Sequence, residues 1–365
     1  MKVCGIVAEY NPFHNGHVYQ LKQIRENLNP DVIVVVMSGA FVQRGEPAIL
    51  DKWLRAKCAV ENGADLVIEL PFEYAIQAAQ GFAEGAIAIL KQAGITHLCF
   101  GSEIGNSENL MDIAETPVNT DHLREMLDEG YGYPEAYSLL TSAMGPNDIL
   151  GVSYLKQLKD SDITPFVIRR TNDYHDETLQ EIASATAIRK AALNKEDTSK
   201  ATPMDLTEPH DELSAYYPYI RTLLLTMKKA DLANIFLFSE GIENHLVKCA
   251  EQCDDYDSFM NMATTRRYTS SRIRRCLVCL MMQYTKEDHK HCEAMIRPLA
   301  FNAKGQAYLK TLAKQEIQIA SKFSQLSEHE RKTAYKATVV YTLTMTKEKR
   351  TALLERELQG PFISR

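Results

Sequence analysis

Five apolar runs of strand length recur along the first half of the chain, separated by segments with helical spacing. The runs lie at residues 2–10, 31–39, 64–71, 95–103 and 163–170. Each is rich in Val, Ile or Leu without clean alternation of polar and apolar residues, which indicates strands that are covered on both faces. Between the first two runs, Val18, Leu21 and Leu28 recur near helical spacing. Strands that alternate with helices predict an α/β fold with a doubly wound parallel sheet.

This pattern changes after about residue 195. Residues 194–212 are polar, contain two prolines and show no apolar period, which is typical of a linker or a long surface crossing. Helical segments follow, with one further strand predicted at residues 336–345. We therefore predict an α/β domain at residues 1–195, a linker at 196–210 and a second, mainly helical domain at 211–365.

Composition narrows the class of protein. Of the 365 residues, 45% are hydrophobic and 24% are charged, which is ordinary for a globular protein. No stretch reaches the roughly 18 consecutive apolar residues of a membrane span, and the apolar run at the start is too short for a signal peptide, so we expect a cytoplasmic protein without membrane contact. The eight irregularly spaced cysteines favour reduced thiols. The net charge of −7 argues against indiscriminate nucleic-acid binding but is compatible with a local basic patch.

The stretch EYNPFHNGH, residues 9–17, lies where the first predicted strand ends and the first helical pattern begins. In a doubly wound sheet, ligands bind at such junctions, where helix N-termini present unpaired N–H groups. Gly16 lacks a side chain, so a phosphate can approach the backbone, and His14 and His17 lie about one turn apart. We predict that the two histidines stabilise charge that develops on a phosphoryl group.

Two other interpretations of this motif compete. In the first, the two histidines occur there by chance and have a purely structural role. In the other, His14, His17 and Glu9 bind zinc. A glycine-containing turn at a helix N-terminus suits an anion better than a cation, so we predict no metal bound by these residues.

Residues at the other strand ends are candidates for the same crevice. Gly101 and Ser102 follow the fourth run, and Asn147 precedes a helical pattern. Gly101 alternatively shapes a turn, and Asn147 alternatively caps a helix. Arg169 and Arg170 end the fifth run and suit bidentate binding of phosphate or carboxylate, with a solvated pair as the alternative.

A further helix start is predicted at residues 181–191. Ser184 or Thr186 lies at its probable first turn, and Arg189 follows a short way in. Ser and Thr are routine N-caps, which is the alternative to phosphate binding at this N-terminus.

Two segments carry candidate RNA contacts. We expect a helix from Pro47 to Gly63 whose charges are mainly a solvated face, with Lys52 and Arg55 as lesser candidates for RNA or phosphate contact. Residues 258–285 contain no acidic residue but five arginines, namely Arg266, Arg267, Arg272, Arg274 and Arg275. This excess predicts an RNA-backbone footprint, with Tyr268 available to stack on a base or ribose. The alternative is a basic face that is paired with acids from elsewhere in the fold.

A possible zinc site follows these arginines. Cys276 and Cys279 form a C-x-x-C pair, and His289, His291 and Cys292 come after it. Both thiols lie in an apolar helical pattern, where they would behave as small hydrophobic residues. The sequence leaves metal binding by this group open.

The H-x-G-H string resembles the signature of the nucleotidyltransferase superfamily. More narrowly, GIVAEYNPFHNGH, MSGAFVQRGEPAILDKWLRAK, ADLVIELP, FGSE, PNDILGVSYLK, IASATAIR and RRYTSSRIRR, in that order, resemble the bacterial tRNA(Met) cytidine acetate ligase family. The resemblance implies that ATP, with Mg²⁺, activates acetate as acetyl-adenylate, and that the acetyl group passes to the N4 amine of the wobble cytidine of elongator tRNA(Met). It implies a Ser-x-Thr-x-x-Arg element at Ser184, Thr186 and Arg189 that grips the outer phosphates.

The resemblance also completes the set of expected site residues. His14 and His17 are expected to be catalytic. The expected nucleotide-binding residues are Val7, Ala8, Glu9, Tyr10, Asn11, Pro12, Phe13, His14, Asn15, Gly16, His17, Gly101, Ser102, Asn147, Arg169, Arg170, Ser184, Thr186 and Arg189. The expected RNA-binding residues are Lys52, Arg55, Arg266, Arg267, Tyr268, Arg272, Arg274 and Arg275.

Two alternative functions are also compatible with the sequence. A small-molecule adenylyltransferase shares the H-x-G-H chemistry but has no need of a second domain with an arginine-rich segment. An RNA-binding protein with a vestigial nucleotide site is the other. No general base for the amine attack and no obligate protein partner is evident in the sequence.

Overall fold

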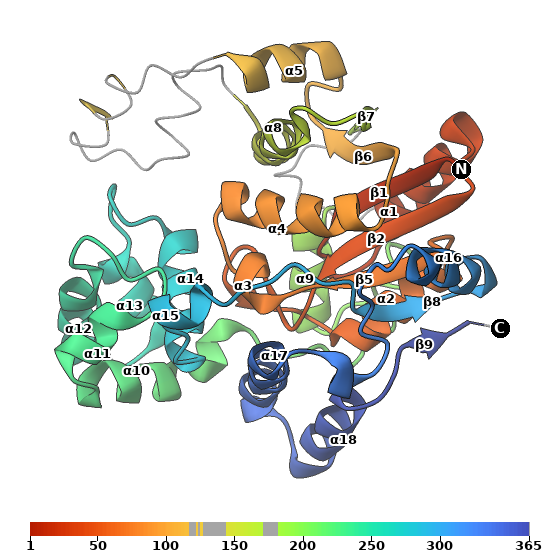
Figure 1. Cartoon of the computed structure of the whole chain (residues 1–365). Helices are drawn as coiled ribbons and strands as arrows, with labels where there is room; N and C mark the ends of the chain where they lie inside the picture. Colours follow the sequence, from red (N-terminus) through yellow and green to blue (C-terminus); the bar gives the residue numbers. More distant parts are fainter. Residues whose placement is uncertain (117–121, 123–124, 127–143, 171–181, 365) are drawn as a thin grey trace.

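The computed structural model describes residues 1–116, 122, 125–126, 144–170 and 182–364 (Figure 1). Its strands are β1 Val3–Ala8, β2 Val32–Ser38, β3 Phe41–Val42, β4 Glu46–Pro47, β5 Leu66–Leu70, β6 His97–Ser102, β7 Thr164–Arg169, β8 Pro298–Phe301 and β9 Phe362–Ile363.

Helices in the first half are α1 Asn15–Gln23, the π-helical turn η1 Ile24–Leu28, α2 Lys52–Glu61, α3 Phe72–Ala75, α4 Ala79–Gln92, α5 Ser107–Glu115, α8 Pro146–Leu158 and α9 Ala185–Leu193. Those in the second half are η2 Leu213–Tyr216, α10 Tyr217–Thr226, α11 Lys229–Asn234, α12 Ile242–Gln252, α13 Tyr256–Ala263, α14 Ser270–Met281, α15 Lys286–His289, α16 Ala303–Lys314, η3 Phe323–Gln325, α17 Glu328–Tyr341, η4 Thr342–Thr344 and α18 Lys347–Glu357.

A seven-stranded sheet in the order β7-β6-β1-β2-β5-β8-β9 forms the centre of the fold. The five predicted strands are β1, β2, β5, β6 and β7, and they pair in parallel. The chain moves from β1 toward β5 on one side and from β6 to β7 on the other, so the strand order reverses between β1 and β6. This confirms the doubly wound α/β prediction, and in such sheets the ligand crevice opens at the point of reversal.

Both faces of the sheet are buried, as the continuous apolar runs predict. Val34 and Val36 of β2 pack with residues of α4, α8 and α16. Their neighbours Ile33 and Val35 pack on the opposite face with residues of α1, α2 and α9. The carboxyl ends of β1 and β6 therefore emerge between two layers of helices, which positions the loops that follow them.

Helices α10–α15 form a separate group beside the sheet, and α17 and α18 pack below it (Figure 1). Apolar residues of this group share one core with Phe41 and Phe72 from the first half of the chain. The mainly helical character predicted for the second half is confirmed, and this shared core ties the helical group to the strand-end loops. No helix among the described residues is long and apolar enough to span a membrane.

Two predictions about single elements are wrong. Residues 336–345 are not a strand, because they lie mostly within α17 and end in η4. A capping box between Ser327 and Glu330 starts α17, and its buried face includes Ala337 and Tyr341. The helix expected to start at Pro47 starts instead at Lys52, where the Asp51 carboxylate accepts hydrogen bonds from two backbone N–H groups.

The end of the chain returns to the sheet. Strand β8 pairs antiparallel with β5, and β9 pairs parallel with β8. The predicted linker packs against the first motif, because Asn15 N donates to Ala201 O (3.0 Å) and Thr202 Oγ1 donates to Phe13 O (2.6 Å). The division at residues 1–195, 196–210 and 211–365 stays a prediction, to which the structure adds that two strands of the last range extend the sheet.

Candidate active site

His14 and His17 cap the start of α1 reciprocally. The backbone N–H of Gly16 donates to His14 Nδ1 (3.0 Å), and the backbone N–H of His14 donates to His17 Nδ1 (3.2 Å). The two imidazole rings lie 3.8 Å apart between centroids. Since each Nδ1 accepts a hydrogen bond, we infer that a neutral ring carries its proton on Nε2. Both histidines therefore present an Nε2–H donor.

The surroundings keep both rings neutral. Burial, together with the charges of Arg170 and Arg189, lowers the pKa of His14 to about 3. Burial also lowers the pKa of His17 well below its ordinary value, helped by His14 and Arg170. The pair can therefore act as neutral hydrogen-bond donors at neutral pH, in a region that two arginines make positive.

Gly16 is required by the cap itself. A Cβ atom there would lie 2.8 Å from His14 Cε1 and 3.0 Å from His14 Nδ1. The sequence predicts that Gly16 leaves room for a phosphate, whereas the structure shows that it leaves room for the His14 ring. Any side chain at this position would push that ring out of its capping geometry.

Residues 7–13 contribute mainly backbone and packing. Val7 and Ala8 end β1, and the side chains of Tyr10, Asn11 and Phe13 are buried. Pro12 follows a cis peptide bond. The Asn11 side chain accepts a hydrogen bond from Ile49 N (2.7 Å), so it shapes the loop.

Glu9 contributes a buried carboxylate to this segment. Glu9 Oε1 accepts a hydrogen bond from the backbone N–H of Gln43 (2.8 Å). Burial raises the pKa of Glu9, although this bond and the nearby Arg44 and Arg189 oppose the rise.

The two arginines at the end of β7 have different surroundings. Arg170 lies against Gly101, where a Cβ would meet Arg170 Cγ at 3.4 Å, and its charge acts on both histidines. Its Nε atom is buried without a hydrogen-bond partner. Arg169 instead packs on Gly105 and is exposed. An unpartnered guanidinium N–H beside two neutral donors favours an anion at Arg170.

Ser102 and Asn147 are held by carboxylates. Ser102 Oγ donates to Asp148, and the Asn147 side chain donates to Glu103, whose other oxygen accepts from Asp148 N (3.0 Å). Their side chains therefore join the end of β6 to the start of α8. Glu103 and Asp148 were missed from the sequence, although an acidic residue directly after a strand and another at a helix start were the available signals.

The start of α9 faces the same motif. Ser184 is the N-cap and accepts a hydrogen bond from Ala187 N (3.1 Å), so the routine capping role is present. Arg189 donates to Asn11 O (2.7 Å) and to Thr186 Oγ1 (3.3 Å). Ile182 lies 3.8 Å from the Cβ position of Gly16. The N-termini of α1 and α9 therefore converge with Arg189 between them.

Lys52 and Arg55 are not surface residues, which contradicts their predicted RNA contact. Lys52 is 4% exposed and pairs with Glu69 (2.6 Å) and Glu357 (2.9 Å). Arg55 is fully buried and donates to the carbonyls of Glu9, Ser38 and Gly39. Buried cations of this kind are satisfied internally, so Arg55 braces the ends of β1 and β2.

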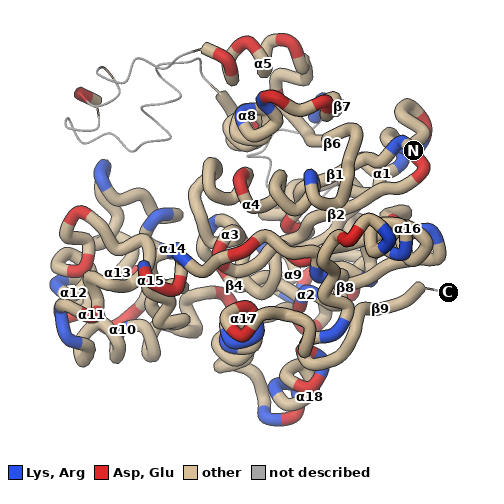
Figure 2. Tube along the Cα trace, in the orientation of Figure 1, with Lys and Arg blue, Asp and Glu red and all other residues tan. Residues whose placement is uncertain are grey.

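The arginine-rich segment lies at and before α14 (Figure 2). Arg267 and Arg272 pair with Glu240 (3.4 and 3.2 Å), and Arg274 pairs with Glu46 (2.8 Å). Pairing with acids from elsewhere, which was the alternative interpretation, is therefore present for these three. Arg266 and Arg267 are exposed.

Tyr268 cannot stack on a base as predicted, because it is 8% exposed. Its hydroxyl donates to Glu240 O (3.0 Å), and the guanidinium groups of Arg267 and Arg272 lie over its ring (5.7 and 5.1 Å). Its observed contacts support these two arginines.

Packing favours the hydrophobic interpretation of the C-x-x-C pair. Cys276 and Cys279 are fully buried within α14, and burial raises the pKa of both thiols, that of Cys276 to about 12. The His289 ring stacks on Phe236 (4.0 Å). Among the residues that the structure describes, no group of three or more His, Cys, Asp or Glu side chains is arranged to hold a metal.

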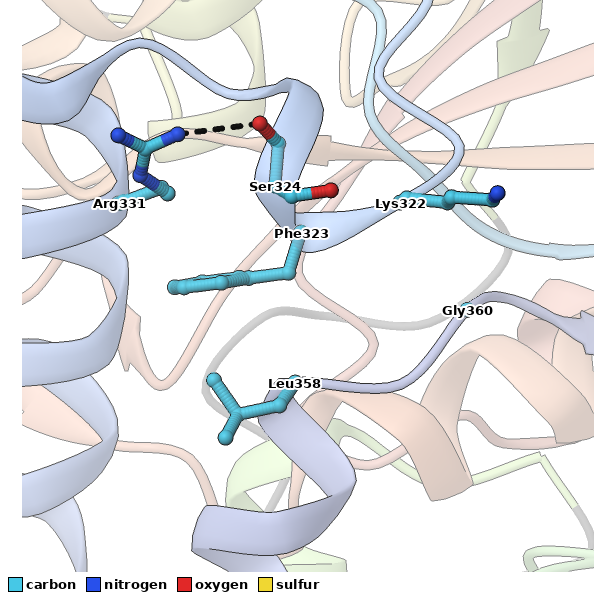
Figure 3. A pocket seen from close by; sticks show the side chains of 6 residues that line it. All are labelled: Lys322, Phe323, Ser324, Arg331, Leu358 and Gly360. Carbon is cyan, nitrogen blue, oxygen red and sulfur yellow. Dashed lines mark hydrogen bonds between the residues drawn. The ribbon is translucent and has the colours of Figure 1, made fainter.

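A surface pocket of about 400 Å³ lies away from this site (Figure 3). Lys322, Phe323, Ser324, Arg331, Leu358 and Gly360 line it. Arg331 donates to Ser324 O (3.0 Å), so this cation is already used inside the wall. None of the predicted site residues contributes to the pocket, and we do not place the chemistry there.

The chain is similar to known proteins along nearly all of its length. The family model described as HIGH Nucleotidyl Transferase matches residues 1–356. A protein of Geobacillus sp. (strain WCH70) named tRNA(Met) cytidine acetate ligase is 36% identical, over 99% of this chain and 99% of its own length. One of the same name from Oceanobacillus iheyensis is 34% identical over 100% of both chains.

Two solved structures are also similar along the whole chain. The apo crystal structure of Thermotoga maritima TmcAL has a TM-score of 0.90, and the structure bound with alpha-thio ATP has a TM-score of 0.88. Each is 31% identical and covers 100% of both chains. The chain therefore belongs to the HIGH nucleotidyl transferases and, within them, to the tRNA(Met) cytidine acetate ligase family.

Proposed function

We propose that the protein uses ATP to activate acetate as acetyl-adenylate and transfers the acetyl group to N4 of the wobble cytidine of elongator tRNA(Met). The names of its relatives and the ATP analogue bound to the similar Thermotoga maritima protein support this function. The observation that carries it is the convergence of His14, His17, Arg170 and Arg189 at the strand-order reversal, which suits an anion.

In the first step, an acetate oxygen attacks the α-phosphorus of ATP. A new P–O bond forms as the bond to pyrophosphate breaks, and the electron pair leaves with pyrophosphate. His14 and His17 donate Nε2–H bonds to the oxygens on which charge grows, and neutral donors do so without giving up a proton. Pyrophosphate leaves toward Ser184, Thr186 and Arg189.

In the second step, the cytidine N4 amine attacks the acetyl carbon. A C–N bond forms, the acyl C–O bond breaks, and AMP leaves with the electron pair while the amine loses a proton to solvent. A positioned nucleophile and a good leaving group supply much of this rate.

The residues that the structure describes do not form a cage for Mg²⁺. No metal-holding cluster occurs within the described ranges, and Mg²⁺ typically binds through substrate phosphates and only one or two carboxylates. Mg²⁺ would therefore enter with the nucleotide, and no step above is assigned to it.

Labelled acetate tests this function against its two rivals. The protein is incubated with ATP and labelled acetate, with and without tRNA. We expect acetyl-adenylate in both reactions and label on tRNA(Met) only when tRNA is present. Adenylyl transfer to a small acceptor without any acetate product would favour an adenylyltransferase. Tight tRNA binding without either product would favour a non-catalytic RNA-binding protein.

Replacing Arg170 should weaken ATP binding more than replacing Arg169. Arg170→Ala removes the partly buried cation beside the histidines, so we expect the Kd for ATP to rise about 10- to 100-fold, the scale of losing a charge-assisted hydrogen bond. Arg169→Ala, the matched control, should change it by less than about threefold because exposed charges contribute little. Calorimetric titration with ATP measures both, and equal losses would remove the distinction between the two arginines.

The arginine segment should make tRNA binding salt-dependent. Each phosphate contact releases counterions, so removing three contacts should flatten the slope of log affinity against log salt by about two units. The triple variant Arg266→Gln, Arg267→Gln, Arg272→Gln tests this by filter binding. It leaves Arg274 and Arg275 unchanged, because these two contact the segment between β3 and β4. A slope like that of the unmodified protein would return the segment to a structural role.

A further inference from the structure

The β3–β4 hairpin touches both halves of the proposed enzyme. Its residue Gln43 donates its backbone N–H to the Glu9 carboxylate (2.8 Å), in the loop that precedes the H-x-G-H motif. The carbonyl of the same Gln43 accepts from Arg275 of α14 (3.5 Å). Glu46, also in the hairpin, pairs with Arg274 of α14 (2.8 Å). The β3–β4 hairpin, residues 41–47, therefore links the loop that carries Glu9 to helix α14.

Gly45 makes this link tight. It has a φ of 78°, and a Cβ atom there would lie 2.3 Å from the backbone N of Arg275 and 2.5 Å from the carbonyl carbon of Arg274. Backbone thus packs directly against backbone, with no space for even a methyl group. The position of α14 against the hairpin is fixed by main-chain atoms, which cannot move aside as a flexible side chain can.

Charges also connect the two sides through the turn. Burial lowers the pKa of Arg44, and the charges acting on this residue are Glu9 and Arg189 on one side and Glu46 and Arg274 on the other. Glu9 in turn interacts with Arg44, Arg189 and Glu46. Arg44 could not be predicted from the sequence, because the strand-end pattern gives no sign that residues 43–46 approach both Glu9 and α14.

We propose that the β3–β4 hairpin is a positioning element that sets how α14, with its bound tRNA, stands relative to the acetyl-adenylate, and that Gly45 and Glu46 are its positioning residues. This inference rests on the proposed function, because it takes α14 as the tRNA-binding helix. Acetate activation needs no RNA, whereas acetyl transfer requires the cytidine amine to come within about 3–3.5 Å of the acetyl carbon. A displacement of α14 therefore slows acetyl transfer but leaves acetate activation unchanged.

Gly45→Ala is the direct test. Its Cβ must retreat from 2.3 Å to at least 3.4 Å from Arg275 N, so hairpin and helix separate by about 1 Å. We expect single-turnover acetyl transfer from preformed adenylate to fall about 100-fold, since a misplacement of this size has that scale of effect. Acetate-dependent pyrophosphate exchange and tRNA affinity should stay within about threefold of the unmodified protein.

Gly63→Ala is the matched control. Gly63 has a φ of 117°, so alanine is strained there too, but its Cβ would meet only Leu21 Cβ, at 3.8 Å. This variant carries a comparable backbone penalty without a collision, and it should transfer acetyl normally. Glu46→Gln keeps the shape of the hairpin and removes the charge that pairs with Arg274 and acts on Arg44, so it remains informative if Gly45→Ala folds poorly. Its transfer rate should fall about 3- to 10-fold, with exchange unchanged.

Three results would overturn the proposal. Equal losses of exchange and transfer in Gly45→Ala would mean that the hairpin supports the nucleotide site alone. Normal acetyl transfer in both Gly45→Ala and Glu46→Gln would mean that the contact between α14 and the hairpin does not affect the transfer step. Collapse of tRNA affinity would make the hairpin part of the binding surface. The Arg266, Arg267, Arg272 triple variant reports separately on the RNA assignment, since its salt slope does not depend on the hairpin.

Discussion

His14→Asn and His17→Asn should each lower acetate-dependent pyrophosphate exchange by about 10²- to 10³-fold, the cost of removing one oriented donor to a developing oxyanion. The asparagine Oδ1 atom reaches the place of the imidazole Nδ1, so it can still accept the backbone N–H that each histidine now accepts. The Nε2–H donor is lost, because the asparagine Nδ2 atom lies at the place of the imidazole Cδ2 and does not reach the Nε2 position. We expect near-normal folding and slow chemistry.

Alanine variants separate the cap from the catalytic donor. His14→Ala loses both, so it should show the same loss of exchange and, in addition, a free energy of unfolding about 1 kcal/mol lower, the usual cost of deleting an N-cap. His17→Ala should likewise lose exchange by two to three decades, on the scale of about 3–4 kcal/mol in the barrier. Near-normal exchange in either Asn variant would contradict the assignment of these histidines to the phosphate.

Lys52→Met should lower the free energy of unfolding by about 3 kcal/mol at pH 7, the low end for breaking a buried ion pair. Lys52 and Arg297 together face Glu69 and Glu357, and all four side chains are at most 8% exposed. Without Lys52, Arg297 alone must balance two buried carboxylates. Urea-induced unfolding measures the loss. Lys22→Met is the matched control, because the Lys22–Glu26 pair is largely exposed and should contribute less than about 0.5 kcal/mol.

The destabilisation of Lys52→Met should shrink at low pH. Burial alone would raise the pKa of Glu69, but Lys52 and Arg297 outweigh it and hold this pKa below its ordinary value of 4.5. A carboxylate with a lowered pKa stabilises the fold above its unfolded pKa and loses that effect as pH falls through the folded value. The difference in the free energy of unfolding between the unmodified protein and Lys52→Met should therefore narrow below about pH 4.5. The salt dependence of tRNA binding should be unchanged, and a flatter slope would restore Lys52 as an RNA contact.

The sequence predicts those parts of the fold whose burial is local. A parallel strand covered on both faces must be apolar throughout, which is why β1, β2, β5, β6 and β7 stand out as continuous runs. Strands β8 and β9 have four and two residues, too few to show any pattern. The error at residues 336–345 has a clear cause, since Thr338, Val339 and Val340 favour a strand by propensity, while the Ser327–Glu330 capping box upstream favours the helix that forms.

The site divides in the same way. His14, Gly16 and His17 are close in sequence, so their grouping at the start of α1 could be predicted from spacing, whereas their reciprocal cap was not predicted. The different surroundings of Arg169 and Arg170 depend on Gly105 and Gly101, which belong to the segment after β6 and to β6 itself. The burial of Lys52 depends on Glu357, 305 positions later, and the contact between Gly45 and Arg275 of α14 also joins two distant parts of the sequence. Contacts of this range leave no periodic trace in the sequence.

Acetate-dependent exchange of labelled pyrophosphate into ATP, in the absence of tRNA, tests most directly the claim that the strand-end site activates acetate. We predict exchange with the unmodified protein, its loss by about 10²- to 10³-fold in His14→Asn, and its retention in the Arg266, Arg267, Arg272 triple variant. Exchange that is independent of acetate, that survives in His14→Asn or that disappears in the arginine variant would contradict the account.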